Sequence, residues 1–419
     1  MNKRVILGIL VFSLILSICN LSLGAEREKK EEIYKQMELF SDAFVDIQSD
    51  YVEEKSPKDL IYGALKGMLS SLDPHSQFLT PNEYKELREE TKGEFGGLGM
   101  EITIKDGLLT IVTPLEDTPA WRVGVKPGDR IVKIDGEPTR DITLLGAMRK
   151  LRGKPGTEVS ITVLREPAKE FLDFKITRDI IKIKDIKDVL ILEDKIGFIR
   201  LVEFRENTPQ DFEKELKRLI KEGCDSLILD LRNNPGGLLD VAVKITQLFL
   251  EPNRLIVSTR GRKKNQNIEF KSKYPSPFLD ISLVILVNSG SASGSEIVSG
   301  CLQDYRRAII LGEKTFGKGS VQTLIPLSDG SALRLTTSKY FTPKEREIHS
   351  KGISPDIIIE EREIEIEPKE KSEDVFERLL EERELKRLPE KYSKDLQLLR
   401  AIDIIKAIKL YREGAKSNI

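Results

Sequence analysis

The apolar positions near the start of the chain predict helices. Five apolar side chains recur at steps of three and four, which places them on one helix face; they are Ile33, Met37, Phe40, Phe44 and Ile47. A second helix is expected to begin at Ser56-Pro57, because a capping serine followed by proline is the usual order at a helix start. We therefore expect residues 27–90 to form a helical N-terminal segment.

Farther along, apolar runs alternate with amphipathic stretches. The runs at 226–231 and 283–287 are typical of buried strands, whereas 208–221 has helical periodicity. This alternation indicates α/β layers, which we expect over 185–358. The preceding residues, 91–180, combine glycine turns with short strand patterns. The expected fold class is therefore α+β and multidomain.

The first 25 residues have the pattern of a targeting segment. Lys3-Arg4 precedes an apolar stretch over 5–23, and a site compatible with cleavage follows at Gly24 or Ala25. The stretch is also long enough for an uncleaved membrane anchor. As a signal peptide or as an anchor, residues 1–25 predict export across the cytoplasmic membrane. We expect the body of the protein to be periplasmic, or anchored to the membrane on its extracytoplasmic side.

The charged residues argue against one class of partner. The chain has 68 lysines and arginines against 69 aspartates and glutamates, a net charge of −1, and the two signs are interspersed. A nucleic acid held by bulk charge is therefore not expected. Charges are densest over 359–419, a helical C-terminal segment with an apolar-faced helix at 395–405. That helix is expected to pack on the body of the protein or on a partner chain.

The candidate chemistry begins where the strand predicted at 283–287 ends. The strand breaks into a cluster of small residues, and a helix pattern follows from Ser293. A helix N-terminus offers free backbone N–H groups to a developing oxyanion, so a serine is well placed here as a nucleophile. Ser293 and Glu296 also fit S-x-x-E, which on its own favours a plain capping box. The motif G-x-S-x-G does not fit, because Ala292 is the third residue counted from Gly290.

A catalytic serine needs a base that takes its proton. The chain has two histidines, His75 and His349, and no buried acidic partner is evident for either, so a Ser-His-Asp triad is disfavoured. A Ser-Lys pair is the recognised variant, and its lysine must be desolvated so that its pKa falls towards neutrality. Lys318 is the candidate, because it lies between two glycines and outside the charged runs. Taken alone, it is also compatible with an ordinary loop lysine.

Together these motifs resemble those of the carboxyl-terminal processing proteases, which are tail-specific, PDZ-containing Ser-Lys serine peptidases. The resemblance rests on Ser-Ala-Ser-Gly-Ser-Glu-Ile at 291–297 and on Gly-Glu-Lys-Thr-Phe-Gly-Lys-Gly-Ser-Val-Gln at 312–322. It extends over nearly the whole chain. It implies that Ser293 is the nucleophile, that Lys318 is the general base and that Gln322 orients the lysine.

The resemblance identifies 91–180 as a PDZ domain. A glycine-rich loop that enters a strand can present several N–H groups to a carboxylate, and the strand edge can accept an extended peptide. The expected peptide-binding residues lie in such a loop and on the helix predicted at 142–151; they are Gly96, Gly97, Leu98, Gly99, Leu145 and Met148. Arg152, at the end of that helix, is the candidate for the family's arginine that couples a loaded groove to the protease core.

Over 185–358 the resemblance implies a crotonase-like β/α spiral that forms the protease core. Consecutive glycines follow the strand at 226–231 and can expose backbone N–H groups to an oxyanion. The resemblance implies that one of them, Gly236 or Gly237, joins the N–H of Gly294 in an oxyanion hole. Taken alone, the pair is typical of a plain strand-to-helix turn. No metal and no cofactor are expected.

The expected function is that of an extracytoplasmic serine endopeptidase that captures C-terminal tails in its PDZ groove and cuts upstream through an acyl-enzyme. Two alternatives stay open: a catalytically silent PDZ scaffold that only binds peptides, and a Ser-His hydrolase of small esters. Apolar groove residues favour proteins or peptides with apolar C-terminal tails. The other expected partners are a second copy of the chain through the terminal helices, an activator or adaptor protein, and a nearby membrane.

Overall fold

The computed structural model describes residues 28, 30–115, 117–166, 169–182, 184–362 and 392–417. The predicted targeting segment and most of the charge-rich C-terminal stretch lie outside these residues. The chain divides into two compact units, Met1–Thr80 and Pro81–Ile419. None of the helices in the described part combines the length and the apolar character needed to cross a membrane.

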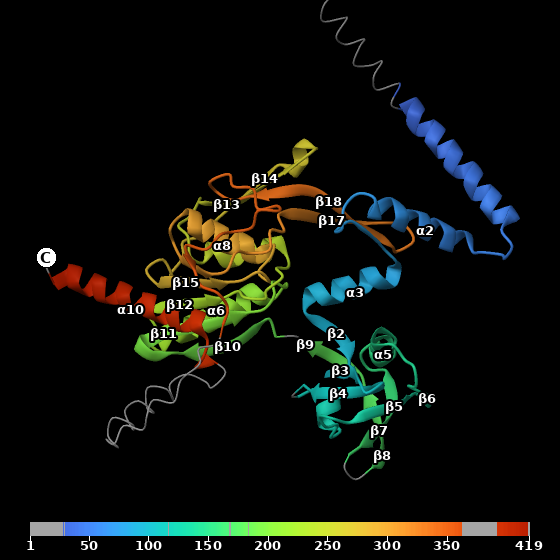
Figure 1. Ribbon diagram of the computed structural model, residues 1–419, viewed down its shortest axis with the longest axis horizontal. Helices are drawn as coiled ribbons and strands as arrows, with labels where there is room; N and C mark the ends of the chain where they lie inside the picture. Colours follow the sequence, from blue (N-terminus) through green and yellow to red (C-terminus); the bar gives the residue numbers. More distant parts are fainter. Residues whose placement is uncertain are drawn as a thin grey trace, which may run out of the picture. The chain divides into compact units, whose positions relative to one another are not determined.

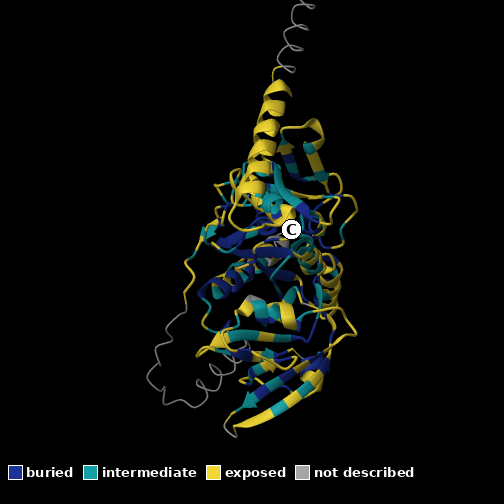
Figure 2. Ribbon diagram, turned by 90° about the vertical axis from the view of Figure 1, so that its right-hand side faces the viewer, coloured by how far each residue is buried: buried dark blue, intermediate teal, exposed yellow. Residues whose placement is uncertain are grey.

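Within its described residues, the first unit contains two helices. One covers residues 30–50, and α2 (Pro57–Ser70) follows with the predicted serine cap and a proline in its first turn. A short strand, β1 (Gln77–Leu79), lies near the end of the unit. The apolar face of the first helix is exposed: Ile33 and Met37 are 55% and 59% accessible to solvent. Figure 2 draws this helix almost entirely in the colour of exposed residues.

The second unit begins with α3 (Pro81–Lys92) and a β-rich domain. The main sheet of this domain has the order β3-β4-β5-β7-β8 with β6 beside β5, and all its pairs are antiparallel. Its strands are β3 (Met100–Lys105), β4 (Leu108–Pro114), β5 (Arg130–Ile134), β6 (Glu137–Pro138), β7 (Glu158–Arg165) and β8 (Glu170–Thr177). A separate ribbon pairs β2 (Glu94–Gly97) with β9 (Asp179–Lys182), and the helices are α4 (Pro119–Arg122) and α5 (Leu144–Leu151).

The core of this domain follows from the alternation of side chains along its strands. On β7, Val159, Ile161 and Val163 are each at most 1% exposed, while the residues between them are not buried. Successive side chains of a strand point to opposite faces, so one face of the sheet is buried and the other is solvated. Strand β3 is at the edge of the sheet, and α5 packs beside it. An edge strand next to a helix can accept an extended peptide.

The other domain of the second unit is built on a sheet of order β10-β11-β12-β15-β16-β19. Strand β10 runs antiparallel to β11, and the remaining pairs are parallel. The strands are β10 (Ile186–Ile191), β11 (Ile196–Leu201), β12 (Ser226–Asp230), β15 (Ser282–Val287), β16 (Ile309–Gly312) and β19 (Ile357–Ile358). The helices are α6 (Thr208–Lys221), α7 (Leu239–Gln247), α8 (Gly294–Asp304) and α10 (Leu396–Ser417), with 3₁₀ turns at Glu193–Lys195 and Lys264–Gln266.

Both faces of this sheet are buried, which explains why its strands are continuous apolar runs in the sequence. Along β15, Leu283, Ile285 and Val287 pack in one hydrophobic cluster with side chains of α6, α7 and α8. The alternate residues Val284 and Leu286 pack in a second cluster with side chains of α10. The C-terminal helix therefore covers the second face of its own core sheet (Figure 1). This confirms the first of the two positions expected for it.

A second sheet in this domain carries the segment that follows the core strands. Strand β18 (Ala332–Phe341) pairs antiparallel with β17 (Ser320–Pro326) and with β13 (Leu255–Gly261), and β13 pairs with β14 (Ile268–Lys271). The β17–β18 register shifts between Val321 and Gln322. Helices and sheets thus form separate layers in more than one domain, and the expected mixed multidomain class is confirmed.

Candidate active site

The site lies at the carboxyl ends of two neighbouring strands. Strands β12 and β15 are parallel and paired, from Ser226 opposite Ser282 to Asp230 opposite Leu286. The loops that follow them, 231–238 and 288–293, therefore leave the sheet at the same edge, where α/β proteins usually place their ligands. The glycine pair predicted for the oxyanion and the candidate nucleophile are thus brought together.

Three serines in the run 291–295 compete for the role of nucleophile, and two of them have structural roles. The hydroxyl of Ser291 donates to the carbonyl of Leu231 at 2.8 Å. The hydroxyl of Ser295 donates to the carbonyl of Asn234 at 2.9 Å. Both residues are fully buried, and both bonds tie the second loop to the first. Neither hydroxyl is therefore placed to attack a substrate.

Ser293 differs from its neighbours in backbone conformation and surroundings. It is the N-cap of α8, with φ 51° and ψ −108°. A residue other than glycine pays about 1–3 kcal/mol for such a conformation, which is found most often at functional sites. Ser293 is 7% exposed. Its side chain interacts with the hydroxyl of Tyr340, a buried residue of β18: burial raises the pKa of Tyr340, and the contact with Ser293 acts in the opposite direction.

The carboxylate of Glu296 joins the candidate nucleophile to the candidate base. One of its oxygens accepts the N–H groups of Ser293 at 2.8 Å and Lys318 at 2.9 Å. The other accepts the N–H of Gly317 at 2.7 Å and the hydroxyl of Thr315 at 2.6 Å. The S-x-x-E pattern predicts the bond to Ser293, but the three bonds to 315–318 have no signal in the sequence. Glu296 is fully buried; burial raises the pKa of its carboxyl, and the four hydrogen bonds act against that rise.

Lys318 has the electrostatic surroundings that a general base needs. It lies in the turn before β17 and is half-buried. Burial lowers the pKa of its amine, the nearby Arg334 lowers it further, and Glu296 raises it. Within the described residues its amine makes no hydrogen bond, so the bond to the Ser293 hydroxyl is not formed in this structure. Catalytic hydrogen bonds are often long before substrate binds.

The side-chain amide of Gln322 makes hydrogen bonds with Ser320 and Thr336 and none with Lys318. Its nitrogen donates to the hydroxyl of Ser320 at 2.9 Å and to that of Thr336 at 3.3 Å. The second contact crosses from β17 to β18 at the register shift, which sequence patterns do not specify. The amide oxygen accepts no hydrogen bond from the described residues. It is therefore available to a donor such as an amine.

The glycine pair lies directly against the nucleophile. A Cβ atom added to Gly236 would come within 2.7 Å of both the Cβ of Ser293 and the nitrogen of Gly294. The N–H of Gly236 already donates to the side chain of Asn234 at 2.9 Å. The N–H groups of Gly237 and Gly294, in contrast, have no acceptor within the described part of the chain. These two N–H groups are therefore the ones free to bind an oxyanion.

Phe204 fixes the conformation of Gly237. The N–H of Phe204 donates to the carbonyl of Gly236 at 2.9 Å, and the N–H of Leu238 donates to the carbonyl of Phe204 at 2.8 Å. Gly237 has φ 143°, and a Cβ atom there would lie 2.2 Å from the Phe204 carbonyl oxygen. A side chain at this position cannot be accommodated without moving the loop.

The groove of the β-rich domain lies between β3 and α5, with a volume of about 220 Å³. It is lined by Phe95, Leu98, Gly99, Met100, Glu101, Ile102, Met148, Leu151 and Arg152. The groove thus includes three of the residues expected to bind peptides. The guanidinium of Arg152 also stacks over the ring of Phe95, 4.4 Å from its centre.

Two expected groove residues lie elsewhere, and one cannot be placed. Gly96 and Gly97 are on β2, paired with β9, and are not among the lining residues. At Gly96 a Cβ atom would lie 2.1 Å from the carbonyl oxygen of Gly153, so close packing of two backbones explains this glycine. The side chain of Leu145 lies outside the described part of the structure.

His349 lacks the partners that a triad would need. The ring Nδ1 of His349 is buried without a hydrogen-bond partner, although the backbone of this residue packs against Gly319. The structure gives His349 no ion pair with a carboxylate among the described residues. The described residues also contain no group of three or more His, Cys, Asp and Glu side chains that could hold a metal ion.

Three family models match successive parts of the chain. Residues 17–82 match the N-terminal domain of the activating protease CtpB, residues 110–165 match a PDZ domain, and residues 195–359 match peptidase family S41. The first match overlaps the helical segment, the second the β-rich domain with the groove, and the third the domain with Ser293 and Lys318. The three matches thus follow one another along the chain as an N-terminal domain, a PDZ domain and a peptidase domain.

Two curated relatives cover most of the chain. A carboxy-terminal-processing protease of Bartonella bacilliformis is 43% identical over 365 residues, which are 86% of this chain and 83% of that protein. A carboxyl-terminal-processing protease of Picosynechococcus is 38% identical over 312 residues, or 73% of this chain and 75% of that protein. Among solved structures, a photosystem II D1 C-terminal processing protease is 29% identical, with a TM-score of 0.46 over 77% of this chain and 92% of that one.

Proposed function

Because the chain belongs to peptidase family S41, among the PDZ-containing C-terminal processing serine proteases, we propose that it cleaves proteins upstream of their C-terminal tails with a dyad of Ser293 and Lys318. One observation carries the proposal. Of the three serines in the run 291–295, Ser293 is the one whose hydroxyl is not committed to a backbone carbonyl, and Glu296 ties its N–H to that of a lysine with a lowered pKa.

The reaction would proceed through an acyl-enzyme. The neutral amine of Lys318 takes the proton of the Ser293 hydroxyl as the oxygen attacks the scissile carbonyl. The oxyanion is bound by the free N–H groups of Gly237 and Gly294, which need no reorganisation when charge develops. Lys318 then gives its proton to the leaving amine. A water molecule attacks the ester in the same way and releases the shortened chain.

Gln322 would orient the lysine through its free amide oxygen. That oxygen accepts a hydrogen bond from the Lys318 amine, while the amide nitrogen keeps its contacts with Ser320 and Thr336. Both the base and its orienter then depend on the β17–β18 pair.

The PDZ groove would select substrates by their last residues. Strand β3 is at a sheet edge and can pair with an extended tail, while Leu98 and Met148 offer apolar surface to its side chains. The substrates proposed are proteins or peptides with apolar C-terminal tails and a free carboxylate. We also propose export across the cytoplasmic membrane, from the targeting pattern of residues 1–25, and control by an activator or a second copy of the chain.

A test uses the chain without residues 1–25 and three versions of one unfolded substrate: with a free C-terminal valine, with the same valine amidated, and with a C-terminal aspartate. The first should be cleaved internally, with a KM about 10–100-fold lower than for the other two. Amidation removes the charge-assisted hydrogen bonds of the carboxylate, and the aspartate side chain does not match the apolar surface of the groove. Ser293→Ala is the blank. Equal KM values for the three substrates would overturn the role of the groove. Tail-dependent binding without cleavage by the parent would instead establish the silent scaffold.

The pH profile provides an independent prediction for the base. Arg334→Gln should move the ascending limb of kcat/KM to higher pH. Lys318 accepts a proton only when neutral, so activity rises as the pH passes its pKa. Burial and then Arg334 lower that pKa, and removing the guanidinium lets it rise. Lys339→Gln, which removes an exposed cation from the same strand, is the control. The same profile in Arg334→Gln and the parent would exclude this electrostatic role.

A further inference from the structure

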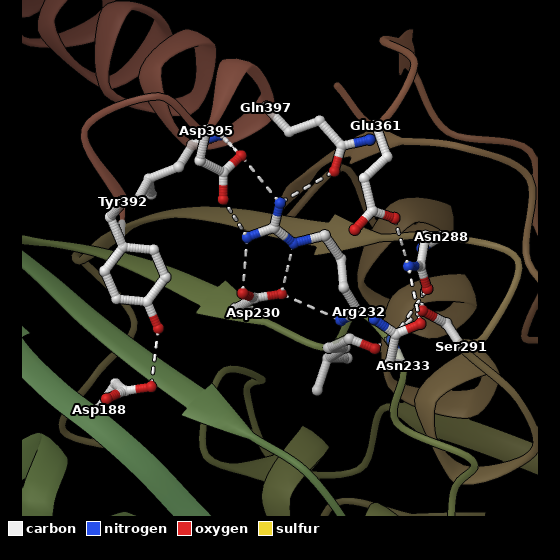
Figure 3. Close-up of polar contacts among 12 residues, drawn as sticks. Asp188, Asp230, Arg232, Asn233, Asn288, Ser291, Glu361, Tyr392, Asp395 and Gln397 are labelled. Carbon is white, nitrogen blue, oxygen red and sulfur yellow. Dashed lines mark hydrogen bonds and ion pairs between the residues drawn. The ribbon is translucent and has the colours of Figure 1, made fainter. Parts of the chain in front are cut away.

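The C-terminal segment contacts both loops of the proposed active site. Figure 3 shows residues from 361 and from 392–397 beside the carboxyl ends of β12 and β15. These residues follow the proposed catalytic lysine by about forty to eighty positions in the sequence, and none of them contributes to the chemistry described above. Asp395 and Gln397 make polar contacts with Arg232 in the first loop, and Glu361 makes one with Asn288 in the second.

Arg232 is held between two carboxylates. Its guanidinium donates to both oxygens of Asp230, at 2.9 and 2.8 Å, and to both oxygens of Asp395, at 2.9 and 2.7 Å. It also donates to the amide oxygen of Gln397 at 3.1 Å. Arg232 is 6% exposed, and Asp230 and Gln397 are fully buried. A planar guanidinium with bidentate partners on two sides has almost no freedom to move.

The start of α10 is fixed by the same residues. The carboxylate of Asp395 accepts the N–H of Leu398 at 3.0 Å, and the amide nitrogen of Gln397 donates to the carbonyl of Ile359 at 2.7 Å. Nearby, the hydroxyl of Tyr392 donates to Asp188 at 2.7 Å, and its ring packs edge-on against Phe198. Residues 392–398 are thus anchored on the core sheet at several points, so the positions of Asp395 and Gln397 beside Arg232 are fixed.

A second contact holds the nucleophile loop. Asn233 and Asn288 form two hydrogen bonds across the two loops. The backbone N–H of Asn233 donates to the amide oxygen of Asn288 at 2.9 Å, and the amide nitrogen of Asn288 donates to the amide oxygen of Asn233 at 3.1 Å. The same nitrogen of Asn288 donates to the carboxylate of Glu361 at 2.8 Å. The Asn288 oxygen also accepts the N–H of Gly290 at 3.0 Å. Glu361 thus braces the loop that leads to Ser293.

The positions of these anchors matter because the proposed reacting groups are only a few residues away. Gly237 lies five positions after Arg232, and Ser293 lies five positions after Asn288. Donors of an oxyanion hole act over a narrow range of distances, and a displacement of about 1 Å can cost on the order of 100-fold in rate. Side chains that fix Arg232 and Asn288, near the start of each loop, therefore control the geometry at Gly237, Gly294 and Ser293.

We infer that Asp395, Gln397 and Glu361 are positioning residues for catalysis, which makes the C-terminal segment part of the active-site support. The inference rests on the proposed function of Ser293 and deepens it. Asp395 and Gln397 act through Arg232 on the oxyanion loop, and Glu361 acts through Asn288 on the nucleophile loop. None of the three touches substrate.

The test compares Asp395→Ala with Asp403→Ala. Asp403 is on α10, which Asp395 directly precedes, and it forms an exposed ion pair with Arg400, so its removal should leave kinetics unchanged. For Asp395→Ala we expect kcat to fall about 10–100-fold with KM within a factor of about two. The rate of labelling of Ser293 by a fluorophosphonate should fall in parallel, because that reaction also uses the oxyanion donors. Asp395→Glu should recover part of the loss.

A second variant distinguishes a loss of positioning from a loss of folding. Glu361 is exposed and makes few contacts, so Glu361→Ala is expected to stay folded and to lose kcat and labelling rate several-fold. Circular dichroism and the denaturation midpoint report the folded fraction of each variant. Folded Asp395→Ala and Glu361→Ala proteins with the parent's kcat and labelling rate would overturn the inference. If the parent itself fails to label at Ser293, the proposed function fails instead.

Discussion

In the proposed mechanism, Ser293→Ala and Lys318→Ala should each lower kcat/KM for an unfolded protein substrate by about 10⁴-fold or more, the size of loss expected when one member of a catalytic unit is removed. Alanine at 293 leaves no oxygen to attack the carbonyl. Alanine at 318 leaves the attacking hydroxyl without a base. The two groups act on the same proton, so the double variant should be no less active than either single one.

Folding should be preserved in both variants. The Ser293 hydroxyl is not bonded to a backbone carbonyl as those of Ser291 and Ser295 are, and the Lys318 amine makes no hydrogen bond within the described residues. Lys318→Ala therefore leaves no buried group unpaired, and Ser293→Ala removes only the contact with the Tyr340 hydroxyl. The free energy of unfolding, measured with urea, should stay within about 1 kcal/mol of the parent.

Ser299→Ala is the matched control for the nucleophile. Ser299 is on the same helix, is fully buried, and donates its hydroxyl to the Ser295 carbonyl at 2.7 Å. Its removal should cost about 1 kcal/mol of stability and leave kcat/KM near the parent value. If Ser293→Ala retained more than a tenth of the parent's activity, Ser293 could not be the nucleophile. Full activity in Lys318→Ala would exclude the lysine as base.

Glu296→Gln should combine a large loss of stability with a large loss of activity. Each carboxylate oxygen accepts two donors. Glutamine keeps one oxygen and turns an NH₂ group towards the other two donors, and each unpaired buried donor costs about 1–3 kcal/mol. We expect a loss of about 2–5 kcal/mol in the free energy of unfolding. The backbones of Ser293 and Lys318 lose their shared anchor, so kcat should fall about 100-fold or more.

Denaturation curves and steady-state kinetics on the same preparations test this prediction. Glu345→Gln is the control for the chemical change, because Glu345 forms an exposed ion pair with Arg260. It should change neither quantity by much. A Glu296→Gln protein as stable and as active as the parent would show that the four hydrogen bonds are not what holds the site together.

The sequence predicts the parts of the fold that depend on local pattern. The uninterrupted apolar run at 283–287 is strand β15, buried on both faces, and Ser56-Pro57 begins α2. Ser293 falls at the strand-to-helix turn because the small residues before it cannot continue the strand and the S-x-x-E pattern begins a helix. Each of these features is determined by residues that are close to one another in the sequence.

Contacts between distant segments are not in the local pattern. The bonds from Glu296 to the turn at 315–318 depend on how β16 and β17 follow α8. The Gln322 contact with Thr336 depends on an irregular register between two strands. Asp395 meets Arg232 across 163 positions. In the PDZ domain, the sequence places the groove loop at 96–99. In the structure, Gly96 and Gly97 are on strand β2, paired with β9, and they do not line the groove.

The burial of the core sheet by α10 has a consequence for synthesis of the protein. Phe198, Ile228 and Leu286 line the face that α10 covers through Leu398 and Ile402. Until residues 396–405 have been made, a nascent chain presents this apolar face to water, where it invites aggregation or capture by a chaperone. The core closes last, by contacts of long sequence separation that form slowly. A growing chain that already contains Ser293 thus has an incomplete core until its C-terminal helix docks.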